Sequence, residues 1–399
     1  MSTVILSPTH VATYPEGGGH FWVYMQYAHA LRSIGCDVYW LERFDPSDWK
    51  QRDDFMLGTF RKRMRQFGME DRTILYTRDG SGRKRYLDAD AAATEALFRR
   101  ADLFLNFHYA IDPELLDLFP RTALVDIDPG LLQHWMHAGE LEVPSHDVYF
   151  TTGETVGAPD AAFSDCGLSW SHIRPAISLD LWPYVEIPEV APFTTISSWI
   201  GGVDGEWVTD GCGGFYDNNK RTSFLEFLEL PTHIDQPLEL ALCLDESEAA
   251  QQLARQAGYT DYLGDVEDRR RLEANGWRVR QAHEVSSSPE AYQAYVQRSR
   301  GEFSCAKPSC MRFRNAWISD RTLCYLASGR PAVVQDTGPS SYLPQHMGLF
   351  RFSTLEDAVA AFEVIGRDYE KQRHAAREIV ETWFDAQKIV SRILEQALF

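Results

Sequence analysis

Short apolar runs that alternate with stretches of helical periodicity are the feature of this sequence that most constrains its fold. Val4, Ile5 and Leu6 form one such run, and the stretch from Phe21 to Ile34 follows it with the spacing of a helix. A buried strand of a parallel sheet is a continuous apolar run, and the chain usually returns to the next parallel strand through a helix. The alternation therefore predicts an α/β protein built on parallel sheets.

The same alternation recurs through the whole chain. In the first half we predict strands at residues 4–7, 37–41, 103–107, 123–127 and 148–151. In the second half we predict strands at 194–198, 238–243, 277–280, 301–304 and 332–335, with helices at 246–257, 289–299, 320–328 and 355–365. Residues 368–398 are expected to be helical with a bend near Trp383.

The length of 399 residues exceeds what one hydrophobic core usually supports, so we expect two domains. Residues 180–193 carry three prolines and no clear periodicity, which is typical of a linker. We therefore predict an N-terminal domain at 1–185, a C-terminal domain at 186–375, and a final helix at 376–399 that packs back on the first domain.

Charge and cysteine content indicate the compartment and the partners. The formal charge of −19 argues against general binding to nucleic acid or a membrane surface, because such binding needs many cations. The seven cysteines are scattered without a CxxC pair, as in reduced cytosolic proteins. No leader-like segment opens the sequence, and no apolar run approaches the roughly 20 residues of a membrane span. We expect a cytoplasmic protein that holds any anion locally.

A group of cations in the second half is the best candidate for an anion site. Residues 303–319, FSCAKPSCMRFRNAWIS, carry Lys307, Arg312 and Arg314 and no acidic residue, and Arg321 follows them. The segment joins a predicted strand to a predicted helix, which is where open α/β sheets bind ligands. Arginine forks, a lysine and helix-start amides together suit a diphosphate. The alternative is a solvated surface that balances acids elsewhere.

The loop after the next predicted strand points to the same ligand. Residues 329–338, GRPAVVQDTG, predict a helix end, a buried strand and a sharp loop. Asp336, Thr337 and Gly338 are then placed at the carboxyl end of that strand, where they can meet the anion. An Asp before Thr-Gly is also a common turn former.

Three glycines precede the first predicted helix. Gly17, Gly18 and Gly19 allow the backbone to approach a bound group, although a glycine run can also be a flexible loop. The GxGxxG fingerprint of a dinucleotide site is absent, and so is an acid placed to bind a ribose. His20 comes next and is a candidate general base, because histidine titrates near neutral pH; a structural histidine is the alternative.

Polar residues follow two more strands of the first half. Asn106 and His108 follow one strand, and Asp126 and Asp128 follow the next. Alternation along a strand puts both aspartates on one side, where they can accept hydrogen bonds from hydroxyls or take a proton. We count His108 and Asp128 with His20 as catalytic candidates. Asp-x-Asp also suits a divalent metal, but no further ligands complete a shell, so we expect none. Asp128 can also simply form a turn.

Motifs of the second half resemble a known family. GEFSCAK at 301–307, SDRTLCYLASGRPAVVQDTG at 319–338 and AAREIVETWFDAQKIVSRIL at 375–394 look like the C-terminal domain of GT-B-fold glycosyltransferases of the group 1 type, in particular the subgroup related to spore maturation protein CgeB. The resemblance implies two Rossmann-like domains with parallel sheets facing across a cleft, and a final helix that crosses back to the first domain. It also implies a nucleotide-sugar bound by the second domain, an acceptor bound by the first, and no metal or other cofactor.

The resemblance also implies roles for single residues. Lys307 and Arg321 match the basic residues that hold the donor diphosphate, and Lys220 matches another lysine of that kind. The donor-binding set that we predict is Lys220, Lys307, Arg312, Asp320, Arg321, Asp336, Thr337 and Gly338. In the first domain Asn106 and Asp126 are predicted to bind the acceptor.

One departure from the family pattern stands out. Group 1 enzymes often carry two glutamates eight residues apart, and here Ala316 and Cys324 stand in those places. Ribose recognition then falls to Asp320, and an inverting mechanism with His20 or Asp128 as base stays open. We expect transfer of a sugar from a nucleoside diphosphate to an unidentified acceptor. An epimerase or hydrolase on the same fold, or an inactive sugar- or nucleotide-binding protein, are the alternatives.

Overall fold

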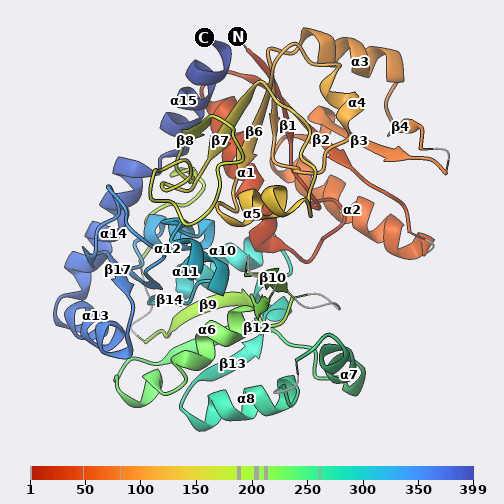
Figure 1. Cartoon of the computed structure of the whole chain (residues 1–399). Coiled ribbons are helices and arrows are strands. Elements are labelled where there is room, and N and C mark those ends of the chain that lie inside the picture. The colour runs from red at the N-terminus through yellow and green to blue at the C-terminus, as the bar shows by residue number, and fades with distance from the viewer. Residues whose placement is uncertain are drawn as a thin grey trace. The chain divides into compact units, whose positions relative to one another are not determined.

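The described chain forms two compact units (Figure 1). The computed structural model describes all residues except 1, 48, 81, 187–189, 202–205, 211–213, 260 and 261. The first unit consists of Met1–Ser178 and Phe384–Phe399, and the second of Leu179–Trp383. The sequence assigned residues 179–185 to the first domain and 376–383 to the returning helix, whereas the structure packs both segments on the second unit.

An eight-stranded sheet forms the first unit, in the order β4-β3-β2-β1-β5-β6-β7-β8. Its strands are β1 Thr3–Ser7, β2 Asp37–Arg43, β3 Thr73–Arg78, β4 Lys84–Leu87, β5 Leu103–Asn106, β6 Thr122–Asp126, β7 Val148–Thr151 and β8 Trp170–His172. Its α-helices are α1 Gly18–Ser33, α2 Lys50–Gln66, α3 Ala91–Arg100, α4 Pro113–Leu116, α5 Leu131–Ala138 and α15 Ala386–Leu398, with a 3-10 turn at Glu70–Arg72. Every neighbouring pair is parallel except β3 and β4.

A seven-stranded sheet forms the second unit, in the order β13-β12-β9-β14-β15-β17-β16. Its strands are β9 Phe193–Ser198, β12 Leu238–Cys243, β13 Arg278–Gln281, β14 Gly301–Ser304, β15 Ala332–Gln335, β16 His346–Met347 and β17 Leu349–Phe352, and a separate hairpin joins β10 Trp207–Thr209 to β11 Phe215–Asp217. Its α-helices are α6 Lys220–Glu226, α7 Glu248–Gln256, α8 Asp265–Ala274, α9 His283–Ser286, α10 Pro289–Arg298, α11 Pro308–Phe313, α12 Asp320–Ala327, α13 Leu355–Arg367 and α14 Tyr369–Trp383, with a 3-10 turn at Leu230–Thr232. The expected α/β class with two parallel sheets is confirmed.

Each unit has its own apolar core. In the first unit the rings of Phe104 and Phe119 stack with their centroids 4.3 Å apart. In the second unit Phe303 and Phe352 stack at 5.2 Å, within a cluster that joins β9, β12, β14 and β17. Helix α15, the dark blue end of the chain in Figure 1, packs against α1 of the first unit, as its expected return to that domain requires.

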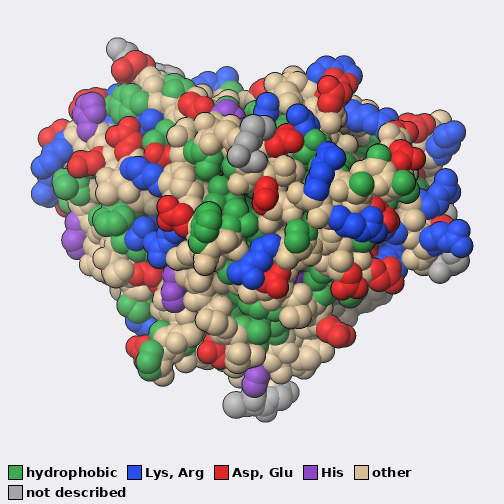
Figure 2. Space-filling view, turned by 90° about the horizontal axis from the view of Figure 1, so that it is seen from above, with side chains coloured by type: hydrophobic (Ala, Val, Ile, Leu, Met, Phe, Trp, Pro, Cys, Tyr) green, Lys and Arg blue, Asp and Glu red, His purple; other side chains and the backbone are tan. Residues whose placement is uncertain are grey.

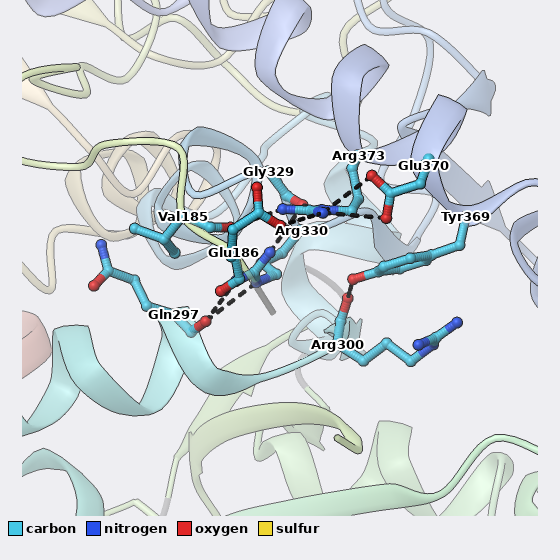
Figure 3. Close-up of polar contacts among 9 residues, drawn as sticks. All are labelled: Val185, Glu186, Gln297, Arg300, Gly329, Arg330, Tyr369, Glu370 and Arg373. Carbon is cyan, nitrogen blue, oxygen red and sulfur yellow. Dashed lines mark hydrogen bonds and ion pairs between the residues drawn. The ribbon is translucent and has the colours of Figure 1, made fainter. Parts of the chain in front are cut away.

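Two buried arginines bind the irregular segment that precedes β9 (Figure 3). Arg330 donates to the carbonyl oxygens of Gln297, at 2.7 Å, and of Glu186, at 3.0 Å. Arg373 donates to the carbonyl oxygen of Val185 at 2.7 Å. The described part of the expected linker before residue 187 is therefore irregular, but it is bound to the second unit.

The edge strand β4 is strongly cationic. Lys84 and Arg85 belong to it, and Arg83 directly precedes it. Figure 2 shows Lys and Arg side chains gathered on this side of the molecule. Charged side chains on an edge strand oppose the addition of a further strand from another chain. The formal charge of −19 is thus not spread evenly over the protein.

Candidate functional site

The strand order of each sheet reverses at one point, and that point predicts where each unit binds a ligand. In the first sheet the reversal lies between β1 and β5, and in the second between β9 and β14. The loops that leave two such strands run in opposite directions, so they open a crevice at the carboxyl ends of the strands. The candidate sites are therefore built by the loops after these four strands.

A pocket of about 430 Å³ lies at the reversal point of the first sheet. The loops after β1, β5 and β6 and the beginning of α1 supply its walls. The lining residues are Thr9, His10, His20, Val23, Tyr24, Phe107, His108, Tyr109, Ala110, Ile127, Asp128 and Leu141. The structure thus brings together the three predicted catalytic candidates.

His20 lies in the first turn of α1 with its ring fixed by the backbone. Its Nε2 is 2.7 Å from the carbonyl oxygen of Thr9. A carbonyl only accepts, so Nε2 carries the proton and Nδ1 keeps its lone pair in the neutral ring. Burial lowers the pKa of His20, which favours that neutral form. His20 is therefore equipped to accept a hydrogen bond through Nδ1.

The glycines before His20 serve close packing. A Cβ on Gly17 would lie 2.3 Å from the ring of Tyr14, so only glycine lets that ring lie against the helix start. The amide of Gly17 also donates to the carbonyl oxygen of Tyr14 at 3.0 Å. Gly18 and Gly19 are the first two residues of α1. In this structure the glycine segment is a tight turn into a helix.

The rings of His108 and His10 lie beside each other at the pocket. Their centroids are 6.3 Å apart. Burial, with a smaller contribution from His10, lowers the pKa of His108 to about 4. His108 is therefore uncharged at neutral pH. The sequence analysis missed His10, and its only signal was its position in the loop after the first strand.

Asp128 is the exposed carboxylate of the pocket, and Tyr109 holds it in place. The Tyr109 hydroxyl donates to Oδ2 of Asp128 at 3.1 Å. The same hydroxyl accepts from the amides of Ile127, at 3.0 Å, and Asp128, at 3.1 Å. A carboxylate that is both exposed and oriented is suited to take a proton from a ligand. Tyr109 was missed because its link to Asp128 spans two strands.

Asp126 does not reach the pocket, so its predicted contact with an acceptor is wrong. It is 0% exposed, and Oδ2 accepts from Gln133 and Thr151 at 2.8 Å each, while Oδ1 accepts from the Asp128 amide at 2.9 Å. Burial raises the pKa of Asp126 to about 7. Asp126 acts on the site by shaping the loop that carries Asp128.

Asn106 is corrected for the same reason. Its side chain is fully buried and bonds to the main chain of His108 through both of its polar atoms, at 2.9 Å and 3.0 Å. Its Nδ2 also lies 3.1 Å from Nε2 of His146. Asn106 therefore holds the turn that presents His108 and leaves no side-chain group for a ligand.

Lys220 is the central cation at the reversal point of the second sheet. It is the first residue of α6 and only 8% exposed, and its Nζ lies 3.2 Å from the carbonyl oxygen of Cys305, just after β14. Burial, strengthened by the nearby charge of Arg321, lowers the pKa of Lys220 to about 7. In the part of the chain that the structure describes, no carboxylate forms an ion pair with it. A buried amine of this kind gains from any anion that binds beside it.

Arg321 does not bind a ligand in the way that the sequence predicted. It is 9% exposed, and its Nε lies 2.7 Å from a carboxylate oxygen of the buried Glu302. It also donates to the carbonyl oxygen of Ile196 at 2.9 Å and to the hydroxyl of Ser304. Arg321 braces β9 against β14, and it reaches the site only through its charge on Lys220.

The other three predicted cations do not form one cluster. Nζ of Lys307 pairs with Glu206 at 2.7 Å, and both side chains are partly exposed. Arg312 lies over the ring of Tyr216 at 3.9 Å, and the exposed Arg314 directly follows α11. The segment at 303–319 contains no acidic residue, but the loop after β9 supplies Glu206 as the partner of Lys307. Of these cations, Lys307 lies nearest in sequence to the carbonyl that Lys220 contacts.

The loop after β15 is held by contacts of its own. Asp336 accepts from the amide of Gly338 at 2.9 Å and pairs with the buried Arg351, so its interpretation as a turn former holds. The Thr337 hydroxyl donates to the carbonyl oxygen of Trp317 at 2.6 Å and is therefore not aimed at a ligand. Gly338 has a φ of 128°, and a Cβ there would lie 2.5 Å from the backbone of Arg314. Close packing therefore requires glycine at this position, and its contact with the donor stays a prediction.

The segment facing this loop holds two strained residues. Arg314, at a φ of 51°, and Ala316, at 57°, occupy the left-handed region without being glycine. Ala316 and Cys324, which replace the family's glutamates, are both buried. Asp320 is the first residue of α12 and is partly exposed, and its contact with a ribose stays a prediction.

The described residues show neither a metal cluster nor a membrane-spanning helix. No group of three or more His, Cys, Asp and Glu side chains there lies close enough together to hold a metal ion. Within that part of the chain, no helix combines the length and the apolar character that crossing a bilayer requires.

Comparisons with solved structures identify the fold of the chain. No protein-family model matches the sequence, and no curated protein sequence matches it. An alpha-glucosyltransferase (AGT) solved with UDP is 12% identical, covers 100% of both chains and has a TM-score of 0.59. HepE from Anabaena, solved with UDP and glucose, is 11% identical, covers 99% of both chains and has a TM-score of 0.54. Sucrose-phosphate synthase from Thermosynechococcus elongatus is 12% identical over 99% of this chain and 98% of its own, with a TM-score of 0.52.

The chain has the GT-B fold. Both units take part in the likeness, because the alignments span the whole of each chain. At 12% identity the similarity is one of fold, so the chemistry of this GT-B protein has to be argued from its own residues.

Proposed function

We propose that this GT-B protein is a glycosyltransferase that moves a sugar from a nucleoside diphosphate to an acceptor hydroxyl without a metal ion. The observation that carries the proposal is Lys220, a buried amine without a described carboxylate partner at the reversal point of the second sheet. A diphosphate supplies the negative charge that this position lacks. The CgeB-related subgroup of the group 1 enzymes is the family that we propose for it.

The chemistry of the leaving group favours this assignment. When the bond from the anomeric carbon to the diphosphate breaks, negative charge grows on the departing oxygen. A protonated Lys220 beside it, in surroundings of low polarity, stabilises that charge more strongly than it stabilises the intact donor. Lys307 adds a second cation once the diphosphate competes with Glu206 for it.

We assign the acceptor to the pocket of the first unit, with Asp128 as the general base. Asp128 takes the proton of the acceptor hydroxyl, whose oxygen then bonds to the anomeric carbon. The diphosphate leaves with the electrons of the broken bond. Tyr109 orients the carboxylate for this step, and His20 can accept a hydrogen bond from a neighbouring hydroxyl through Nδ1.

Uridine diphosphate is the nucleotide to test first, because the AGT and HepE structures contain UDP. We expect UDP to bind the wild-type protein. We expect UDP-glucose to turn over when a cell extract supplies the unidentified acceptor. Lys220→Ala should lower UDP affinity at least tenfold, since a charge-assisted contact of this kind contributes about 1.5–3 kcal/mol. Isothermal titration measures the binding, and UDP release measures the turnover.

Lys371→Ala is the matched control, because Lys371 is an exposed lysine in α14 of the same unit. It should leave UDP affinity unchanged. Equal affinity in Lys220→Ala and the wild type would remove the donor site proposed here. Release of UDP without any acceptor would favour a hydrolase, and binding of UDP-glucose without turnover would favour a binding protein.

A further inference from the structure

The pocket of the first unit contains no cation of its own. Its described lining includes no Lys and no Arg. The three histidines that could supply positive charge are His10, His20 and His108, and burial lowers the pKa of the latter two. Asp128 is the only carboxylate among the described lining residues, and it is exposed. An acceptor with a phosphate or carboxylate group in this pocket would meet repulsion from Asp128 and no Lys or Arg among the described lining residues.

Most of the residues that line the pocket are aromatic or aliphatic. Tyr24, Phe107 and Tyr109 present rings, and Val23 and Leu141 are aliphatic lining residues. The Tyr24 ring packs at a steep angle to its neighbours, with its centroid 5.5 Å from that of Phe107 and 5.2 Å from that of His20. Tyr24 and Phe107 are buried in this packing and Tyr109 is partly exposed, so the rings form an apolar wall against which a ligand ring can pack.

The polar groups of the pocket are suited to hydroxyls. Asp128 accepts hydrogen bonds as a carboxylate, and His20 accepts through Nδ1 because its Nε2 is committed to Thr9. Two acceptors in the lining of one pocket can fix the orientation of a ligand that donates from two hydroxyls. The volume of about 430 Å³ is in the range that holds a small ring compound.

From the rings, the two acceptors and the missing cations, we infer that the acceptor of this enzyme is an uncharged ring compound with a free hydroxyl, and not a phosphorylated or carboxylated one. This inference rests on the proposed function, and it names the acceptor class of the same site. A neutral sugar and a phenol share this chemistry. In both cases the hydroxyl proton passes to Asp128 as the oxygen bonds to the anomeric carbon and the diphosphate leaves.

Binding to the first unit can be measured without the donor. Two matched pairs of probes differ by one anionic group: glucose with glucose 6-phosphate, and 4-methylphenol with 4-hydroxybenzoate. Saturation-transfer NMR on the full chain should show at least about tenfold tighter binding of the neutral member in at least one pair. Leu141→Trp, which narrows the pocket, should remove that binding. The pair whose neutral member binds more tightly shows whether the acceptor is a sugar or a phenol.

A charge-insertion variant tests the electrostatic argument directly. Ala110 is an exposed lining residue outside the proposed catalytic set. Ala110→Lys should improve the binding of the anionic member of the responding pair about tenfold, whereas Ala110→Gln, of similar length and no charge, should not. Circular dichroism of both variants shows that they are folded.

Tighter binding of the anionic members to the wild type, equal binding within both pairs, or no binding of either neutral probe would each overturn the inference. Failure of the donor proposal is distinguishable, because UDP affinity is measured separately and depends on Lys220. A protein that binds UDP and prefers an anionic acceptor would keep the proposed function and lose this inference. A protein that binds the neutral probes but not UDP would keep the ligand class inferred for the pocket and lose the proposed donor site.

Discussion

Lys220 is the residue whose protonation a bound diphosphate would change most. Burial lowers its pKa to about 7, so at pH 8 most of the ligand-free protein carries it as a neutral amine. A diphosphate beside it favours the charged form and raises the pKa again. Binding of UDP at pH 8 should therefore take up close to one proton, and at pH 6, where Lys220 is already charged, much less. Isothermal titration in buffers with different ionisation enthalpies measures this uptake.

The matched controls separate Lys220 from other groups. Lys220→Met should abolish the uptake at pH 8, and Lys371→Met, on the surface of the same unit, should leave it unchanged. The β-phosphate of UDP loses its second proton near pH 6. Proton release from UDP on binding therefore contributes only at low pH, and it does not imitate proton uptake at pH 8. Uptake at pH 8 that persists without Lys220 would contradict the assignment.

At the scale of elements, Arg330 ties three pieces of the second unit together. Its guanidinium is fully buried and donates to the carbonyl oxygens of Gln297 and Glu186, at the end of α10 and in the segment before β9. Arg330→Met has a similar length and leaves these oxygens without a donor. Both hydrogen bonds are partly buried, so the loss of each costs about 1–2 kcal/mol and the free energy of unfolding should fall by about 2–4 kcal/mol.

Calorimetry would record this loss as a lower melting temperature of the second unit. Arg367→Met is the control, because Arg367 forms an exposed pair with Glu363 in α13. Exposed pairs of this kind contribute about 0–1 kcal/mol, so its melting temperature should stay close to the wild type. Arg330→Lys keeps the charge without the fork and should fall between the two. An unchanged melting temperature in Arg330→Met would show that the segment is held by other contacts.

The elements that the sequence predicted best are those whose environment is apolar on both sides. Strands β12, β14 and β15 begin and end at the predicted residues, and each is largely buried. Helix α2 was missed because it is rich in Lys, Arg and Asp, and its buried face is narrow. Strand β8 was missed because its three residues, Trp170–His172, carry no alternation that a sequence pattern can reveal.

The site was harder to predict than the sheets. His20, His108 and Asp128 were found because each follows an apolar strand, and strand ends of a parallel sheet converge. The role of Arg321 was mistaken because its partner Glu302 lies on a separate element, strand β14. Charge pairs of this kind depend on which strands become neighbours, and the local sequence does not contain that information.

At the scale of the whole molecule, the first unit is completed by the last residues of the chain. Helix α15 buries Ile389, Val390 and Ile393 in the first unit, beside α1. Each of these side chains contributes about 1.5–3 kcal/mol through burial, so together they approach the stability of a typical domain. The second unit ends at Trp383 and does not include α15.

Truncation after Trp383 should therefore unfold or loosen the first unit and spare the second. Hydrogen exchange should become fast in β1 and α1 while β14 and α12 keep their protection, and UDP should still bind at Lys220. Deletion of Phe399 alone is the control, because that side chain is fully exposed and its loss removes no buried surface. If both units lost protection together, the two would fold as one cooperative body, and the donor site could not be studied apart from the acceptor pocket.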